Sequence, residues 1–272
     1  MALLFTLFSA VALAAGVTFP TNVALSTADG QTLQASVGVP SKAVNGVVFV
    51  HMAGRSRDDW HAVADKLYRG GLLVLTVDLR GHGANVTGAP AALTGADWSA
   101  MVGDVQAGVA ELRKRGAKKV AVVGAEVGAN LALLAAADDP TITSVALLSP
   151  GLDYKGLITG EAAKRYGARP VFYVASKDDP YGLRSATTLD SIATGVHTLQ
   201  VFEKAGKGTA MFNREPALES LLLGFVNTSW TAPTAPVAAT PSEIKVKAED
   251  MKTTGTRLGE KPAEPAPAPA PQ

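Results

Sequence analysis

The chain has 272 residues, of which 47% are hydrophobic and 18% are charged, and its formal net charge is +1. This balance favours one main globular domain, and its scattered basic residues exclude the electrostatic footprint that nucleic acid binding requires. The absence of cysteine excludes disulfides and thiolate metal sites, and the four histidines lack the spacing of a metal cluster, so we expect no metal, no other cofactor and no nucleic acid partner.

An apolar run opens the chain. Residues 1–16 read MALLFTLFSAVALAAG and end in Ala12-Leu13-Ala14, the small-x-small pattern that signal peptidase accepts. The run is shorter than the ~20 residues that a membrane-spanning helix needs. We therefore expect residues 1–15 to be a signal peptide and the protein to be exported to the periplasm or the extracellular space. An uncleaved N-terminal membrane anchor is the alternative, and no other transmembrane segment is expected.

Strands and helices alternate through a domain predicted to span residues 20–228. Two alternating runs around Ala28-Asp29-Gly30 predict a hairpin over 23–39. Continuous apolar runs predict strands over 46–51, 72–78, 120–124, 145–149, 171–176 and 197–202. Helices are predicted over 58–69, 97–115, 127–137, 182–193 and 213–227. Uniformly apolar strands separated by helices are typical of a parallel sheet covered on both faces, so the predicted fold is a three-layer α/β sandwich opened by an antiparallel hairpin.

The composition changes from about Ser229 onward. Residues 229–272 are poor in large apolar side chains and close with alternating Pro and Ala. Such a segment cannot build a core, and its last part should sample polyproline II. We expect residues 229–272 to form a disordered tail that acts as a spacer or associates with the cell envelope.

A tight turn between a strand and a helix is the most informative motif. Gly124 and Gly128 flank Glu126 in the spacing that such an elbow requires. One glycine relieves steric conflict at the turn, and the other lets the helix pack closely. Since ligands bind at the carboxyl ends of the strands in α/β sheets, this turn belongs to the edge where function is expected.

Two more loops at this edge carry a family resemblance. HMAG (51–54) ends the first parallel strand, and DLRGHG (78–83) ends the next. With the elbow, these motifs resemble the α/β-hydrolase family over about residues 23–228, and 51–83 is similar to the family's HG-x loop, helix A and D-x-R-G-H-G run. The segment 150–170, where lids are usually inserted, is short, so the resemblance is to compact members such as dienelactone hydrolases or serine aminopeptidases. It implies that His51 and His82 order their loops.

The resemblance implies three catalytic positions and an oxyanion hole. Members have a nucleophile at the elbow, an acid after the penultimate strand and a base after the last strand. These positions hold Glu126, Asp179 and Lys207, with Asp178 as the alternative acid. The backbone amides of Ala53 and Val127 occupy the positions of the oxyanion hole. The glycines that shape the loops are kept, whereas the usual Ser and His are replaced.

The two replacements favour an ion pair over a rearranged catalytic site. A carboxylate nucleophile at Glu126 needs a base to activate water, so the pKa of Lys207 would have to fall by roughly three units. Carboxylates at Glu126 and Asp179 favour the ammonium instead. We therefore expect a Glu126–Lys207 ion pair with Asp179 as a third member, the alternative being that both side chains point to water.

Three function hypotheses follow from these residues. The first is an exported, catalytically silent member of the hydrolase family that binds a small ligand or a protein partner. The second is an active hydrolase of esters or related bonds with a non-standard Glu/Asp/Lys site, which rests on family membership alone. The third is a passive anchor for the tail in an envelope assembly. Packing within helices or loops is the expected role of Trp98, Tyr154 and Tyr166, and a place in the wall of the pocket is the alternative.

Overall fold

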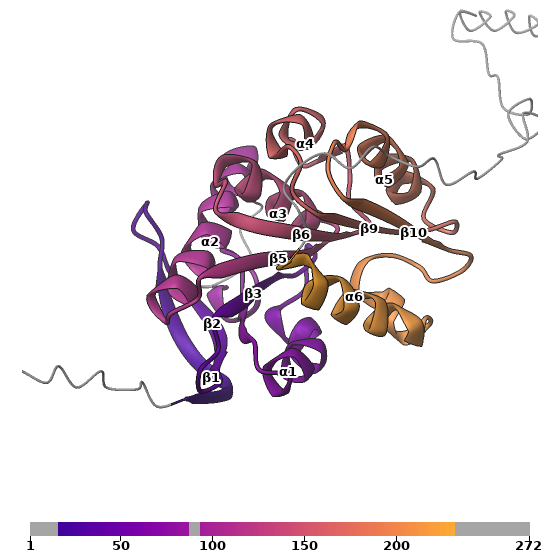
Figure 1. Cartoon of the computed structure of the whole chain (residues 1–272). Coiled ribbons are helices and arrows are strands. Elements are labelled where there is room, and N and C mark those ends of the chain that lie inside the picture. The colour runs from indigo at the N-terminus through magenta and orange to yellow at the C-terminus, as the bar shows by residue number, and fades with distance from the viewer. Residues whose placement is uncertain (1–15, 87–92, 232–272) are drawn as a thin grey trace, which may run out of the picture. The chain divides into compact units, whose positions relative to one another are not determined.

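A central eight-stranded sheet organises the computed structural model, which describes residues 16–86 and 93–231. The strand order is β1-β2-β4-β3-β5-β6-β9-β10 (Figure 1). β1 (Val17–Ser26) and β2 (Thr32–Val39) pair antiparallel, and β2 pairs antiparallel with β4. Every other pair in the sheet is parallel. The predicted parallel sheet with an N-terminal antiparallel hairpin is thus confirmed.

The parallel strands inside the sheet are largely buried on both of their faces. They are β3 (Asn45–Val50), β4 (Leu73–Val77), β5 (Lys119–Ala125), β6 (Ile142–Leu148) and β9 (Val171–Ser176), whereas β10 (His197–Phe202), at the edge of the sheet, is only partly buried. Every residue of β4 and β9 is buried. Burial on both faces explains why these strands read as continuous apolar runs instead of alternating ones.

Helices cover the two faces of the sheet and complete three layers (Figure 1). One face carries α2 (Gly95–Lys114), α3 (Val127–Asp138), α4 (Gly160–Tyr166) and α5 (Pro180–Ile192), and the other carries α1 (His61–Arg69) and α6 (Pro216–Ser229). Each face has its own apolar core, with Met101, Leu131 and Leu189 in one and Trp60 and Leu222 in the other. The predicted three-layer α/β sandwich is confirmed.

The structure differs from the prediction between residues 150 and 170. This segment contains the hairpin of β7 (Asp153–Tyr154) and β8 (Leu157–Ile158), followed by α4. The hairpin turns at Lys155 and Gly156, whose φ values are 55° and 84°. Strands of two residues are too short to produce a period-2 pattern, so the pattern of apolar residues in the sequence did not indicate them.

Three short 3₁₀ turns, η1 (Arg57–Trp60), η2 (Gly83–Asn85) and η3 (Gly208–Asn213), shape loops at the carboxyl edge. The helix predicted from residue 213 begins at Pro216, because η3 precedes it and proline is well suited to the first helical position. β1 begins at Val17, earlier than the predicted run.

The predicted signal peptide (1–15) and nearly all of the predicted tail (229–272) lie outside the described residues. α6 ends at Ser229, and Trp230 after it is 8% exposed and belongs to the apolar core on that face. Across residues 16–86 and 93–231, no helix combines the length and the apolar character needed to cross a membrane.

Candidate functional site

Glu126 occupies a strained turn between β5 and α3. Its backbone has φ 52° and ψ −117°, which side chains other than glycine rarely adopt. A Cβ atom on Gly124 would lie 2.1 Å from the carbonyl oxygen of Gly128, and one on Gly128 would lie 2.5 Å from that of Val50. Both glycines are therefore required by close packing, as their spacing predicted.

Lys207 and Glu126 form a direct ion pair. Lys207 Nζ lies 2.5 Å from Glu126 Oε1, and the two side chains are 55% and 11% exposed. The hydrogen bond to Glu126 raises the pKa of Lys207 above its ordinary value, and the negative charge of Asp179 adds to the rise. The expected pair is present, and Lys207 keeps its positive charge at neutral pH.

Asp179 turns toward its own helix. Its Oδ1 accepts a hydrogen bond from the amide of Gly182 at 3.1 Å, which caps the start of α5. Its Oδ2 is buried and has no hydrogen-bond donor among the described residues. The expected three-membered cluster is therefore not formed by direct contacts, because the amide of Gly182 holds the carboxylate and Asp179 acts on Lys207 only through its charge.

Asp178 holds the loop that carries Lys207. It accepts hydrogen bonds from the amide of Gly206 at 2.9 and 3.2 Å and from the hydroxyl of Ser176 at 2.5 Å. The Ser176 hydroxyl and then the Gly206 amide lower the pKa of Asp178. Asp178 thus connects the ends of β9 and β10, and the assignment of Asp179 as the family's acid position stays a prediction.

Ser149 is a residue of this edge that the sequence did not single out. It follows β6 with φ 49°, is fully buried, and accepts a hydrogen bond from the amide of Gly208 at 3.0 Å. The available signal was a serine at the carboxyl end of an apolar strand. Together, Asp178 and Ser149 fix the glycines on both sides of Lys207.

The small hairpin brings Tyr154 to the site. Its ring packs against Tyr181 with the centroids 5.2 Å apart, and a Cβ on Gly151 would lie 2.6 Å from its Cδ2. Burial raises the pKa of Tyr154, and the negative charges of Glu126 and Asp179 raise it further. The phenol therefore stays neutral and lies within the electrostatic range of both carboxylates.

The other two aromatic candidates serve in packing. The buried hydroxyl of Tyr166 donates a hydrogen bond to the carbonyl of Pro170 at 2.7 Å. Trp98 is 7% exposed and packs edge-on against the ring of His82, with the centroids 5.6 Å apart. Within the described ranges, neither side chain forms a hydrogen bond with Glu126 or Lys207.

The loops after β3 and β4 are held by two buried histidines. His51 Nδ1 lies 2.7 Å from the carbonyl oxygen of Met52, and its Nε2 accepts a hydrogen bond from the amide of Leu79 at 3.0 Å. Burial lowers the pKa of His51 to about 4, so the ring is neutral. His82 packs beside it with the ring centroids 5.2 Å apart. The loop-ordering role implied by the resemblance is confirmed.

The amides of Ala53 and Val127 follow β3 and begin α3. Neither donates a hydrogen bond to another residue that the structure describes. Their assignment to an oxyanion hole stays a prediction. Next to Ala53, Met52 occupies the position of the family's glycine, and its sulfur accepts a hydrogen bond from the amide of Thr209 at 3.3 Å. Within the described ranges, no group of three or more acidic or histidine side chains could hold a metal ion.

Comparisons with known proteins identify the family to which the chain belongs. A family model described as serine aminopeptidase, S33, matches residues 41–178, half of the chain. The esterase Pf2001 of Pyrococcus furiosus is similar, with 16% identity, a TM-score of 0.62, and coverage of 77% of this chain and 90% of that one.

Two further solved structures share the fold. Dienelactone hydrolase from Anabaena variabilis has 18% identity and a TM-score of 0.59, and the match covers 79% of this chain and 99% of that one. The esterase EaEST from Exiguobacterium antarcticum has 15% identity and a TM-score of 0.59, covering 76% and 100%. Comparison with curated proteins gave no match. From the family model and the shared fold, the chain belongs to the serine aminopeptidase S33 family of α/β-hydrolases.

Proposed function

We propose that this protein is a catalytically silent member of the α/β-hydrolase family that binds a small ligand or a protein partner at the edge of the sheet holding Glu126 and Lys207. The observation that carries the proposal is the 2.5 Å contact between Lys207 Nζ and Glu126 Oε1. The sequence motifs assign these side chains to the positions of the family's nucleophile and base. A neutralising ion pair at those two positions supplies neither of the groups that acyl transfer needs.

Hydrolysis through a Glu126 ester requires a base that Lys207 does not provide. The carboxylate can in principle attack an electrophilic carbon, but water must then be deprotonated to release the product. An ammonium has no lone pair to accept that proton, and the hydrogen bond from Lys207 to Glu126 raises the pKa of Lys207. Loss of Ser or His from such a triad leaves only about 10³- to 10⁴-fold acceleration over water.

Groups that suit ligand binding remain at the same edge. The amides of Ala53 and Val127 are unpaired among the described residues, and the negative charge of Glu126 helps to keep the phenol of Tyr154 neutral by raising its pKa. A ligand with a carbonyl or hydroxyl oxygen has donors available here. This arrangement supports binding without turnover.

The test compares the native protein with a double reversion. Native protein should be inert toward p-nitrophenyl acetate and butyrate and toward a fluorophosphonate probe that labels reactive serines. The variant Glu126→Ser/Lys207→His should be labelled by the probe, whereas Glu126→Ala/Lys207→Ala should not. Native ester turnover that disappears in Glu126→Gln, with the fold intact, would instead establish the active-hydrolase alternative.

Export is a separate part of the proposal and rests on the sequence of residues 1–15. If the segment is a cleaved signal peptide, N-terminal sequencing of protein from the periplasm or medium should begin close after Ala14. A full-length N-terminus that stays in the membrane fraction would establish the anchor instead. Deletion of residues 232–272 tests the envelope role of the tail, since an attached protein should then leave the envelope fraction.

A further inference from the structure

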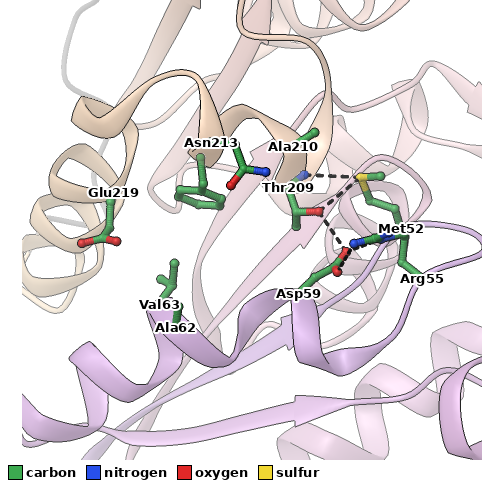
Figure 2. A pocket seen from close by; sticks show the side chains of 10 residues that line it. Met52, Arg55, Asp59, Ala62, Val63, Thr209, Ala210, Asn213 and Glu219 are labelled. Atoms are coloured by element: carbon green, nitrogen blue, oxygen red, sulfur yellow. Dashed lines mark hydrogen bonds and ion pairs between the residues drawn. The ribbon is translucent and has the colours of Figure 1, made fainter.

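A second candidate binding site lies on the face covered by α1 and α6 (Figure 2). The cavity measures about 610 Å³ and is bordered by residues from η1, α1, η3 and α6. This volume is within the range of small-molecule sites. Glu126 and Lys207 do not line it. We propose that the cavity binds a small carboxylic acid with an apolar body, independently of the site at Glu126 and Lys207.

One end of the cavity presents a fixed guanidinium. Arg55 donates to Asp59 through Nε at 2.9 Å and through Nη2 at 2.6 Å. The side chain of Asp59 is only 9% exposed, and it also accepts a hydrogen bond from Thr209 Oγ1 at 3.0 Å. Burial alone would raise the pKa of Asp59, but these hydrogen bonds lower it overall. Asp59 therefore stays ionised and orients Arg55.

Arg55 has donors left for a ligand. Its side chain is 56% exposed, and Asp59 uses two of the five N–H groups that a guanidinium carries. Asn213 also lines the cavity, and its side-chain carboxamide makes no hydrogen bond within the part of the chain that the structure describes. Both oxygens of Asp59 are already engaged. This end thus offers donors, which suit a carboxylate.

The rest of the wall is apolar. Ala62 and Val63 of α1, which Figure 2 shows, and Phe212 of η3 contribute apolar side chains to the lining. The ring of Phe212 is itself held by an edge-on contact with the buried Trp60, with the centroids 5.8 Å apart. An acyl chain or an aromatic ring fits between these surfaces, because it removes apolar area from water without leaving a polar group unpaired.

Charge fixes the orientation of the ligand. Glu219 lies at the end of the cavity away from Arg55 and is paired with Lys66 (Figure 2). A carboxylate placed beside Glu219 meets like charge, whereas beside Arg55 it meets a guanidinium. The acid therefore enters with its charged end toward Arg55 and its apolar body over Phe212.

The binding test uses octanoate as the probe and 1-octanol as its uncharged counterpart, measured by calorimetry on the full chain. Octanoate should bind saturably. Arg55→Gln should weaken octanoate binding about tenfold or more, since a hydrogen bond to a charged group is lost, and should leave octanol binding unchanged. Arg69→Gln is the matched control, because Arg69 also forms an (i, i+4) pair, with Asp65 at 2.8 Å, but does not line the cavity.

A cavity-filling variant tests the location. Ala62 is an exposed residue of α1, so Ala62→Trp should block both probes without unfolding the protein, whereas Ala110→Trp at an exposed position of α2 should not. No saturable octanoate binding, or equal binding in native, Arg55→Gln and Ala62→Trp proteins, overturns the inference. Loss of octanoate binding in Lys207→Gln but not in Arg55→Gln also overturns it, because the ligand would then bind at Glu126 and Lys207. The ester assays test the proposed silence separately.

Discussion

The hydroxyl of Ser149 accepts a hydrogen bond from the amide of Gly208 at 3.0 Å, and this contact ties the end of β6 to the loop that carries Lys207. Ser149→Ala leaves the buried Gly208 amide without its acceptor. We expect the free energy of unfolding to fall by about 1–3 kcal/mol, the usual cost of such a group. Urea denaturation measures the change, and faster hydrogen exchange at Gly208 should accompany it.

Ser149→Gly provides the control for backbone strain. It removes the same hydroxyl but relaxes the φ of 49°, which costs a residue with a side chain about 1 kcal/mol. The glycine variant should therefore be less destabilised than the alanine variant. An alanine variant as stable as the native protein would show that this contact does not hold the loop.

The ion pair predicts a specific alkaline behaviour. The pKa of Lys207 lies above its ordinary value of 10.5, so the pair's contribution to stability is complete below that value and is lost as the pH rises through the pKa of the folded protein. Glu126→Gln should lower the pKa of Lys207 and remove this loss. Carbon NMR of the lysine side chain measures the pKa directly.

The size of this effect is limited by solvent. Lys207 is 55% exposed, so we expect the pair to contribute about 1 kcal/mol or less. Asp179→Asn is the matched control and should lower the pKa of Lys207 by a smaller amount, because Asp179 acts without a hydrogen bond. An equal drop in both variants would contradict the geometry described for the pair.

The buried side chain of His51 should make the folded protein less stable in acid. Its pKa falls from 6.5 to about 4 on folding, so the unfolded chain binds more protons than the folded one between these values. Stability is unaffected above pH 6.5 and decreases as the pH falls toward 4, by about 3 kcal/mol in total. His51→Gln should flatten this part of the profile of unfolding free energy against pH. Titration of the His51 ring near pH 6.5 in native protein would exclude this explanation.

The packing at the elbow predicts intolerance of a single methyl group. Gly128→Ala places a Cβ 2.5 Å from the carbonyl oxygens of Val50 and His51. We expect a destabilisation of about 3 kcal/mol or more, because backbone cannot move aside as a flexible side chain does. Gly103→Ala in α2 is the control, since a Cβ there meets nothing within 4 Å and should stabilise the helix by up to about 1 kcal/mol. Equal thermal stability of the two variants would contradict this account.

Much of the fold was predictable because the parallel strands inside the sheet are almost entirely buried. β9 was predicted over its whole length, and its six residues are all buried. The β7–β8 hairpin was not predictable, since it depends on a turn at Lys155 and Gly156 and on the packing of Tyr154 against Tyr181. Contacts of this kind join residues whose spacing follows no period.

The site was predictable only where a motif fixes position. The elbow and the loop after the last strand placed Glu126 and Lys207 together, and their pairing follows from charge. Local competition among hydrogen-bond donors decided the remaining contacts: Asp179 turned to the amide of Gly182, while Asp178 took the amide of Gly206. Neighbouring carboxylates of equal chemistry cannot be told apart without the loop geometry.

The turn at residue 126 has φ 52° and ψ −117° although it carries the side chain of a glutamate. The close approach of Gly124 to Gly128 therefore maintains the turn, whichever side chain it presents. A short side chain substituted at this position should therefore leave the backbone in the same direction. Redesign of this chain can therefore change the side chain at residue 126 without changing the backbone of the turn.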